Sequence, residues 1–361
     1  MLIIINEKYI YFFFFLFAQT FILSAIASVT LAACGGAETK PAEPAATSQP
    51  AASASGAAAP AADGTPKRVA ITAIVEHPAL DAVRKGVEEQ LAADGYKVGT
   101  NLTIDFQSAQ GNTATAGQIA KKFAGDKPDV IVAIATPSAQ SVVAATRDVP
   151  VVFAAVTDPV AAKLVTSWEP SGTNVTGVSD ELPLEPQIDL MKKLVPNVKA
   201  VGYVYSPGEV NSTVILEKLK TQLKTQGIEV IGAPAQRTTD ISTAANSLAG
   251  KVQMIYTTTD NNVVSGYESL YKVAVANKIP LLASDTDTVK RGASAALGVN
   301  YHDMGMQAGK IVTRILKGEK PGTIATQKME KLDLFVNPKA AQTQGFTIPE
   351  ELVKSAKEVI Q

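Results

Sequence analysis

Apolar runs and helical patterns alternate along the chain from about residue 68 onward. Short apolar runs bounded by turn-forming residues predict strands, and apolar positions that recur every three or four residues predict helices. The first series has predicted strands at 69–75, 102–107, 130–135, 151–156 and 175–178, and predicted helices at about 79–94, 113–124 and 138–146. The second series has predicted strands at 200–205, 229–231, 252–257, 280–283 and 293–297, and predicted helices near 210–226, 241–248, 263–277 and 304–317. This alternation predicts two α/β units, each a parallel sheet covered by helices on both faces.

The turn Thr136-Pro137-Ser138 is the first candidate for chemistry. The apolar run before it predicts a strand buried on both faces, and a helical pattern follows it. Free backbone N–H groups, the positive end of the helix dipole and two hydroxyl groups therefore converge there, and they could hold an anion such as a carboxylate. The alternative is an ordinary turn in which Ser138 only caps the helix.

Several other predicted strands end in similar polar clusters. In open α/β sheets, ligands bind beyond the carboxyl ends of the strands, so such clusters on two units would form the facing rims of one cleft. The clusters are 76–78, 136–138 and 157–159 in the first unit, and 206–212, 257–261 and 284–287 in the second. The alternative is that these residue types serve only as helix caps and turn formers.

Composition narrows the possible functions. The chain has 361 residues, of which 46% are hydrophobic and 19% charged, and its formal net charge is -1. This balance does not predict the basic surface that nucleic acid requires. Cys34, His77 and His302 are the whole supply of cysteine and histidine, too few for a metal cluster, a disulfide framework or a Cys–His nucleophile in the folded part. We therefore expect no metal and no cofactor.

Enzyme motifs are also missing from the sequence. Ser138 has no histidine partner other than His77, and there is no G-x-S-x-G elbow. A glycine-rich phosphate loop with lysine is not found either. We expect a binding protein rather than an enzyme.

The amino end predicts export. Residues 9–33 are strongly apolar and end in small residues, which is typical of a signal peptide, here 1–33. The sequence L-A-A-C-G at 31–35 resembles the bacterial lipoprotein signal, which implies cleavage before Cys34 and lipid attachment to it. The alternative is an uncleaved anchor, because the apolar run is long enough to span a membrane. Residues 34–66, rich in Ala and Pro, predict a disordered tether, and both interpretations place the remainder outside the cytoplasm beside a membrane.

Several motifs, in order and at matching spacing, resemble those of ABC transporter substrate-binding proteins for tryptophan, tyrosine and related amino acids. They are 75–81 (VEHPALD), 133–140 (AIATPSAQ), 156–160 (VTDPV), 174–180 (NVTGVSD), 208–212 (GEVNS), 256–261 (YTTTDN) and 298–301 (GVNY). The resemblance implies a type I periplasmic binding fold, which has two doubly wound parallel-sheet lobes, three hinge crossovers and a ligand cleft between the lobes.

The fold implied by this resemblance divides the chain into alternating segments. Lobe 1 would contain 67–182 and 299–328, and lobe 2 would contain 183–298 and 329–361. The prolines at 183 and 186 mark a plausible first crossover. The alternation of strands and helices by itself predicts one crossover rather than three.

The ligand-binding candidates follow from the chemistry of an α-amino acid. Thr136, Ser138 and the N–H groups beside them suit its carboxylate. For its ammonium group the candidates are Asp158, Glu209, Asp260 and Asp285, of which one or two would reach it. Further candidates are Asn211 and Asn261 for either end, and Glu76 and His77 for the ligand or the hinge; His77 has an alternative role as a helix cap.

Aromatic residues and His302 are less specific. Tyr205 and Tyr301 could stack on an aromatic ligand or belong to the core or hinge. Trp168 is expected outside the cleft, and His302 on the surface or at the hinge.

The expected function is that of an extracytoplasmic binding lipoprotein of an ABC importer. The resemblance implies an aromatic amino acid (Trp, Tyr or Phe) as ligand, delivery to a permease with its ATPase, and lipid on Cys34 as the membrane anchor. We expect a monomer that does not bind nucleic acid. The alternatives are an extracytoplasmic ligand sensor, or a binding protein for another small solute such as a branched amino acid or a nucleoside.

Overall fold

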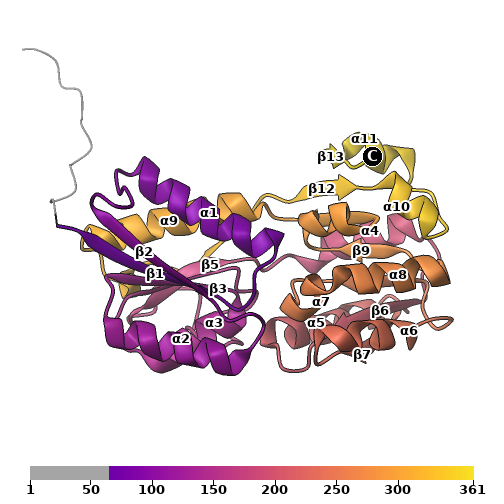
Figure 1. Ribbon diagram of the computed structural model, residues 1–361. Coiled ribbons are helices and arrows are strands. Elements are labelled where there is room, and N and C mark those ends of the chain that lie inside the picture. The colour runs from indigo at the N-terminus through magenta and orange to yellow at the C-terminus, as the bar shows by residue number, and fades with distance from the viewer. Residues whose placement is uncertain (1–64) are drawn as a thin grey trace, which may run out of the picture. The chain divides into compact units, whose positions relative to one another are not determined.

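The computed structural model describes residues 65–361. The predicted signal peptide, Cys34 and nearly all of the predicted tether lie outside the described residues. Two sheets organise the described part, and each has its own set of covering helices (Figure 1). This arrangement confirms the predicted α/β fold of two lobes.

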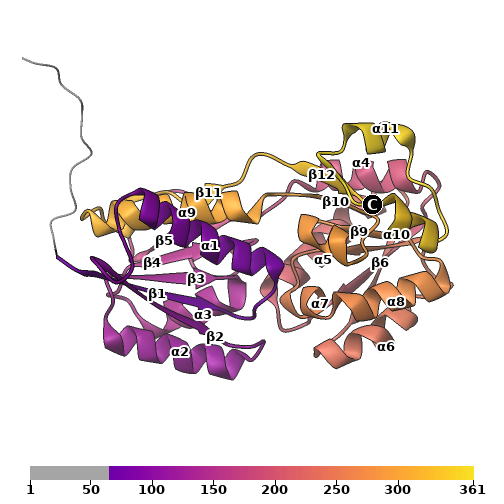
Figure 2. The ribbon, with the colours of Figure 1, turned by 45° about the horizontal axis from the view of Figure 1, so that its top comes forward.

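The first sheet is wholly parallel, in the order β11-β5-β4-β3-β1-β2. Its strands are β1 Lys67–Ala73, β2 Leu102–Ser108, β3 Val130–Ile134, β4 Val151–Ala154, β5 Val175–Ser179 and β11 Gln327–Lys328. Every residue of β3 is buried, as the apolar run predicts for a central parallel strand. Helices cover both faces: α1 Pro78–Ala93 and α9 Tyr301–Leu316 on one, α2 Thr113–Asp126 and α3 Thr136–Ala145 on the other (Figure 2).

The second sheet has the order β13-β12-β10-β9-β8-β6-β7, and only the β10–β12 pair is antiparallel. Its strands are β6 Ala200–Tyr205, β7 Glu229–Pro234, β8 Met254–Thr257, β9 Leu281–Ala283, β10 Ala295–Gly298, β12 Asp333–Val336 and β13 Glu358–Val359. Its helices are α4 Leu184–Leu194, α5 Val210–Lys224, α6 Ile241–Asn246, α7 Asn261–Ser265, α8 Tyr267–Asn277, α10 Pro338–Thr343 and α11 Glu350–Ser355. Two hydrophobic clusters, one on each face of this sheet, form its core.

The chain passes between the sheets three times. The first passage lies between β5 and α4, the second between β10 and α9, and the third between β11 and β12. Three passages agree with the family resemblance and not with the single crossover that the alternation alone predicts.

Helix α9 returns to the first sheet and packs closely against α1. Its buried residues include Met304, Ala308, Ile311 and Ile315, which recur every three or four positions. Glycines allow the close approach, since a Cβ atom on Gly86 of α1 would clash with the backbone of α9.

Two local features differ from the sequence prediction. Helix α4 is not predicted, because two prolines suggest a crossover; Pro186 lies in its first turn, where a missing N–H breaks no helical hydrogen bond. The predicted helix at 263–277 is broken at Gly266 into α7 and α8, and a Cβ atom there would clash with Thr238 and Ile241.

Candidate functional site

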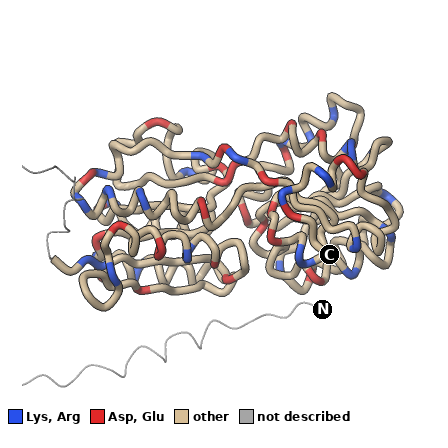
Figure 3. Tube along the Cα trace, turned by 90° about the horizontal axis from the view of Figure 1, so that it is seen from above, with Lys and Arg blue, Asp and Glu red and all other residues tan. Residues whose placement is uncertain are grey.

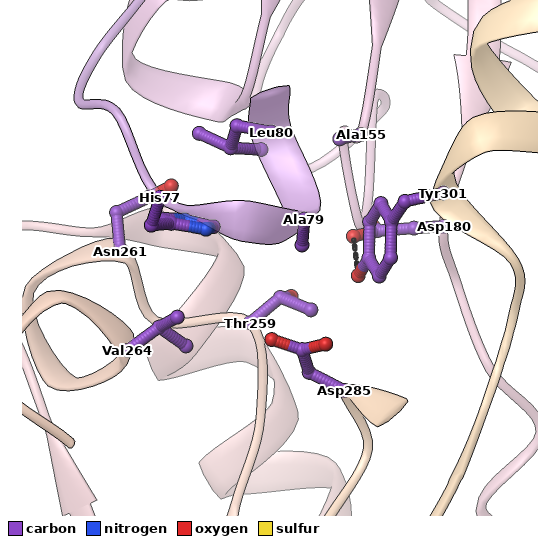
Figure 4. Close-up of a pocket in the computed structure, with 10 residues that line it drawn as sticks. All are labelled: His77, Ala79, Leu80, Ala155, Asp180, Thr259, Asn261, Val264, Asp285 and Tyr301. Carbon is purple, nitrogen blue, oxygen red and sulfur yellow. Dashed lines mark hydrogen bonds between the residues drawn. The ribbon is translucent and has the colours of Figure 1, made fainter. Parts of the chain in front are cut away.

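A central cavity lies where the carboxyl ends of the two sheets face each other. It has an empty volume of about 260 Å³. The first lobe contributes His77, Ala79, Leu80, Ala155, Asp180 and Tyr301, and the second contributes Thr259, Asn261, Val264 and Asp285 (Figure 4). Residues of both lobes thus enclose one small cavity.

Two further hollows adjoin the central cavity. The outer one has an empty volume of about 1330 Å³ and shares Asn261 with it. The inner one, of about 280 Å³, shares Asp180 and Thr259 with it, and its walls include Leu182, Leu184, Ile215 and Tyr256. The three hollows thus form one interlobe cleft, and the inner one combines these apolar walls with Thr157, Thr258 and Ser284.

Backbone strain is concentrated at the cleft edge of the first sheet. Gln110, Ala135 and Ala155 have φ values of 51°, 71° and 55° and follow the strands β2, β3 and β4. At Ala135 ψ is 155°, which combines with its φ in a region that only glycine adopts readily. Such strain is typical of functional sites, where the surrounding fold holds a backbone in an unfavourable conformation.

Buried polar atoms without hydrogen-bond partners also gather around the cleft. They include Nδ1 of His77, Oγ1 of Thr136, Oγ of Ser138, Oδ1 of Asp180 and Oδ1 of Asn211. Buried polar groups in folded proteins are nearly always paired, so unpaired ones that share a cleft indicate a place for a polar ligand.

Helices α1 and α3 begin at this edge without a side-chain cap on their first N–H groups. The cap position of α3 is Ala135, so Ser138 lies inside the first turn and is not the simple cap that the sequence leaves open as an alternative. Thr136 and Ser138 are buried and line none of the three hollows, whereas Pro137 between them lines the outer hollow.

Two carboxylates reach the central cavity from opposite lobes. Asp285 was expected from the sequence, whereas Asp180 was not singled out, although it ends the 174–180 motif. The Tyr301 hydroxyl donates to Oδ2 of Asp180 at 3.1 Å (Figure 4). Burial raises the pKa of Asp180 and raises the pKa of Asp285 to about 7.

Glu209, Asn211 and Asn261 form one hydrogen-bonded group. Oε2 of Glu209 accepts hydrogen bonds from the side-chain amides of Asn211 at 2.9 Å and Asn261 at 2.7 Å, and from the backbone N–H of Asn261 at 3.0 Å. Burial, followed by repulsion from the carboxylate of Asp260, raises the pKa of Glu209 to about 7. Glu209 lines the outer hollow.

Asp260 is committed to the protein itself. It caps α7 by accepting from the N–H of Val263, and it accepts from the backbone N–H and hydroxyl of Ser206 at 2.6 and 2.8 Å. It lies beside the cleft but lines none of the three hollows.

Asp158 contributes to an ion pair between the lobes. Lys218 of α5 donates to Asp158 at 3.1 Å and to Glu181 at 2.8 Å. Burial opposes ionisation of Asp158, but hydrogen bonds from Ala161 and Lys218 outweigh it and lower the pKa of Asp158. Residues of both charges gather near this junction of the lobes (Figure 3).

The remaining candidates divide into cleft and surface residues. His77 lines the central cavity and occupies the cap position of α1, and burial lowers its pKa to about 4. The surface residues are Glu76, His302 and Trp168. Glu76 is exposed, and a ring nitrogen of His302 lies 2.8 Å from a carboxylate oxygen of Glu89. The ammonium of Lys328 lies over the ring of Trp168. Thr259, which sequence reasoning missed, lines the central cavity and bonds Thr157 of the other lobe at 3.2 Å.

Within residues 65–361, no group of three or more acidic, histidine or cysteine side chains is placed to hold a metal ion. None of the helices that the structure describes is both long and apolar enough to cross a membrane.

Comparison with known proteins agrees with this geometry. Residues 68–360 match the family described as ABC transporter substrate binding protein. A tyrosine-binding protein of Clostridioides difficile (strain R20291) is 40% identical over 271 residues, which cover 75% of this chain and 79% of that protein.

Two solved structures are similar to this chain in sequence and fold. An ABC domain from Streptococcus pneumoniae in complex with L-Trp is 35% identical, with a TM-score of 0.79 over 82% of this chain and 100% of that one. The ligand-free, open structure of a substrate-binding protein with adhesive properties from Clostridium difficile is 38% identical, but its TM-score is 0.63 over 82% and 99% of the two chains. On fold, site geometry and sequence match together, the chain belongs to the family of ABC transporter substrate-binding proteins.

Proposed function

We propose that this protein binds an aromatic amino acid in the interlobe cleft and delivers it to an ABC permease with its ATPase. The observation that carries the proposal is a small cavity lined by residues of both lobes, in which His77 and Asp180 keep buried polar atoms without hydrogen-bond partners. The tyrosine-binding relative and the L-Trp complex favour an aromatic ligand.

The ligand carboxylate would lie at the start of α3. Free N–H groups and the helix dipole attract an anion there, and the hydroxyl groups of Thr136 and Ser138 have no competing partner. Glu209, Asn211 and Asn261 would support this end of the cleft as a preformed hydrogen-bonded group.

The ligand side chain would use the apolar walls of the inner hollow. Leu182, Leu184 and Ile215 give this hollow a surface on which an aromatic ring loses contact with water. A sugar would instead need polar groups around its whole circumference.

A thermal-shift screen of the purified protein tests the proposal. We expect L-Tyr, L-Trp or L-Phe to raise the melting temperature, because a ligand that binds only the folded state stabilises it. Branched amino acids, nucleosides and sugars serve as comparison ligands. Stabilisation by one of those classes, and by no aromatic amino acid, would refute the proposed ligand.

We further propose that the protein acts as a monomer tethered to a membrane by lipid on Cys34, after cleavage of residues 1–33. Replacing Cys34 by Ala should release the protein from the membrane fraction, since no cysteine would remain to carry lipid. A Cys34→Ala variant that still sediments with membranes would favour the uncleaved anchor.

A further inference from the structure

Asp180 and Asp285 form an acidic pair without a committed cation. Their exposed fractions are 3% and 2%, and they follow β5 of the first sheet and β9 of the second. One oxygen of Asp180 accepts from Tyr301, and the other has no hydrogen-bond partner although it is buried. Oδ1 of Asp285 accepts from the N–H of Asp287 at 2.9 Å.

The neighbouring basic groups do not neutralise this pair. Among the described residues, no lysine or arginine forms an ion pair with either carboxylate. The charge of Arg291 acts to lower the pKa of Asp285. Its guanidinium, however, donates hydrogen bonds to Glu268 at 2.7 and 2.8 Å and to the Val264 carbonyl at 2.6 Å. Burial keeps His77 neutral over most of the pH range by lowering its pKa to about 4.

We infer that Asp180 and Asp285 together bind the ammonium group of the ligand, and that binding releases a proton from the pair. The inference rests on the proposed function, since it concerns an amino acid in the same cleft. It assigns the ammonium to the two carboxylates that line the central cavity, one from each lobe. Contact with both would require the lobes to close around the ligand.

The proton balance follows from the burial of the pair. In the empty cleft, burial and then repulsion from the carboxylate of Asp287 raise the pKa of Asp285 to about 7, so below neutral pH this group holds a proton. A nearby ammonium ion favours the ionised carboxylate, so the carboxyl proton leaves to solvent as the ligand binds. The charge of the ammonium takes the place of the charge of the released proton, and the net charge of the site stays the same. Lower pH therefore opposes binding.

Other titratable groups lie near the same region, and the experiment must control for protons that they bind or release. Tyr301 stays protonated because burial raises its pKa. Burial also raises the pKa of Asp287, and the pKa of Glu209 is raised to about 7 in the outer hollow. A proton count must therefore distinguish Asp285 from Asp287 and Glu209.

The test is calorimetric titration of the purified protein with L-tyrosine at pH 6 in two buffers of different ionisation enthalpy. We expect release of about one proton per ligand, and a Kd that rises by about tenfold for each further pH unit below the pKa of the pair. Binding without proton release and with a Kd independent of pH between 5 and 8 would overturn the inference.

Three variants assign the proton. Asp285→Asn should abolish the release and weaken binding by at least about tenfold, because a neutral amide cannot balance the ammonium charge. Asp287→Asn keeps the backbone N–H that Asp285 accepts but removes a repulsion that raises the pKa of Asp285, so it should change the Kd at pH 8 by less than about twofold. Glu209→Gln should still release the proton. If Glu209→Gln removes the release and Asp285→Asn does not, the assignment is wrong.

A ligand analogue separates this inference from the proposed function. 3-(4-Hydroxyphenyl)propionate lacks the ammonium group, so it should bind more weakly than tyrosine at pH 8 and release no proton. Equal affinity of the two compounds at pH 8 would contradict the ammonium site while leaving an aromatic ligand in place. Failure of every aromatic amino acid to bind at any pH would instead contradict the proposed function.

Discussion

At the residue scale, some buried polar groups near the cleft have hydrogen-bond partners within the protein and others have none. Asp260 has its hydrogen bonds within the protein, whereas Thr136, Ser138 and Asp180 keep buried oxygens without partners. The sequence placed Thr136, Ser138 and Asp260 near strand ends but did not single out Asp180. It could not separate caps from ligand-binding residues, because the same residue types serve both roles. It could not predict the hydrogen bonds between residues far apart in the chain, such as that between Ser206 and Asp260, which are 54 positions apart.

Replacing Ser138 by Ala tests the carboxylate end. The hydroxyl has no partner in the protein, so its loss should leave thermal stability unchanged but weaken aromatic amino acid binding by about 1 kcal/mol, or roughly fivefold. Calorimetry and thermal unfolding would measure the two effects. Ser141→Ala, on the same helix but bonded to the Pro137 carbonyl at 2.9 Å, is the matched control and should bind normally. Equal affinities of both variants and the wild type would remove Ser138 from the site.

At the element scale, the sequence predicted most strands and helices, because buried parallel strands are continuous apolar runs and their covering helices are amphipathic. It missed α4, whose proline lies in the first turn, and it joined α7 to α8 across Gly266. The effect of Pro186 depends on its position within the helix, and the effect of Gly266 depends on packing against Thr238 and Ile241, which lie far from it in the sequence.

Helix α5 makes an electrostatic contact with the other lobe through Lys218. Its ammonium lies 3.1 Å from Asp158 and 2.8 Å from Glu181, and its side chain is 39% exposed. A partly exposed ion pair contributes at most about 1 kcal/mol and is weakened by salt.

Replacing Lys218 by Met should therefore favour the open arrangement and raise the Kd of the ligand by up to about fivefold. The salt dependence of Kd should also decrease. Lys220→Met is the matched control, because Lys220 pairs only with Glu217 of the same helix. Small-angle scattering with and without ligand would measure opening, and identical profiles for Lys218→Met and wild type would argue against a role of the ion pair in closure.

At the scale of the whole molecule, residues from both lobes line the cleft. Alternation of strands and helices predicted the two α/β units, but only the family resemblance predicted that the chain passes between them three times. Local sequence carries little information on such returns, because α9 and β11 are identified as first-lobe elements only by their packing partners.

Calorimetric titration of the purified protein with L-tyrosine and L-tryptophan at pH 8 tests the central claim most directly. We expect one ligand per chain, a Kd of roughly micromolar or tighter, and a negative heat-capacity change as apolar surface is buried. The absence of binding heat with every aromatic amino acid at several temperatures, together with saturable binding of a branched amino acid, a nucleoside or a sugar, would contradict it.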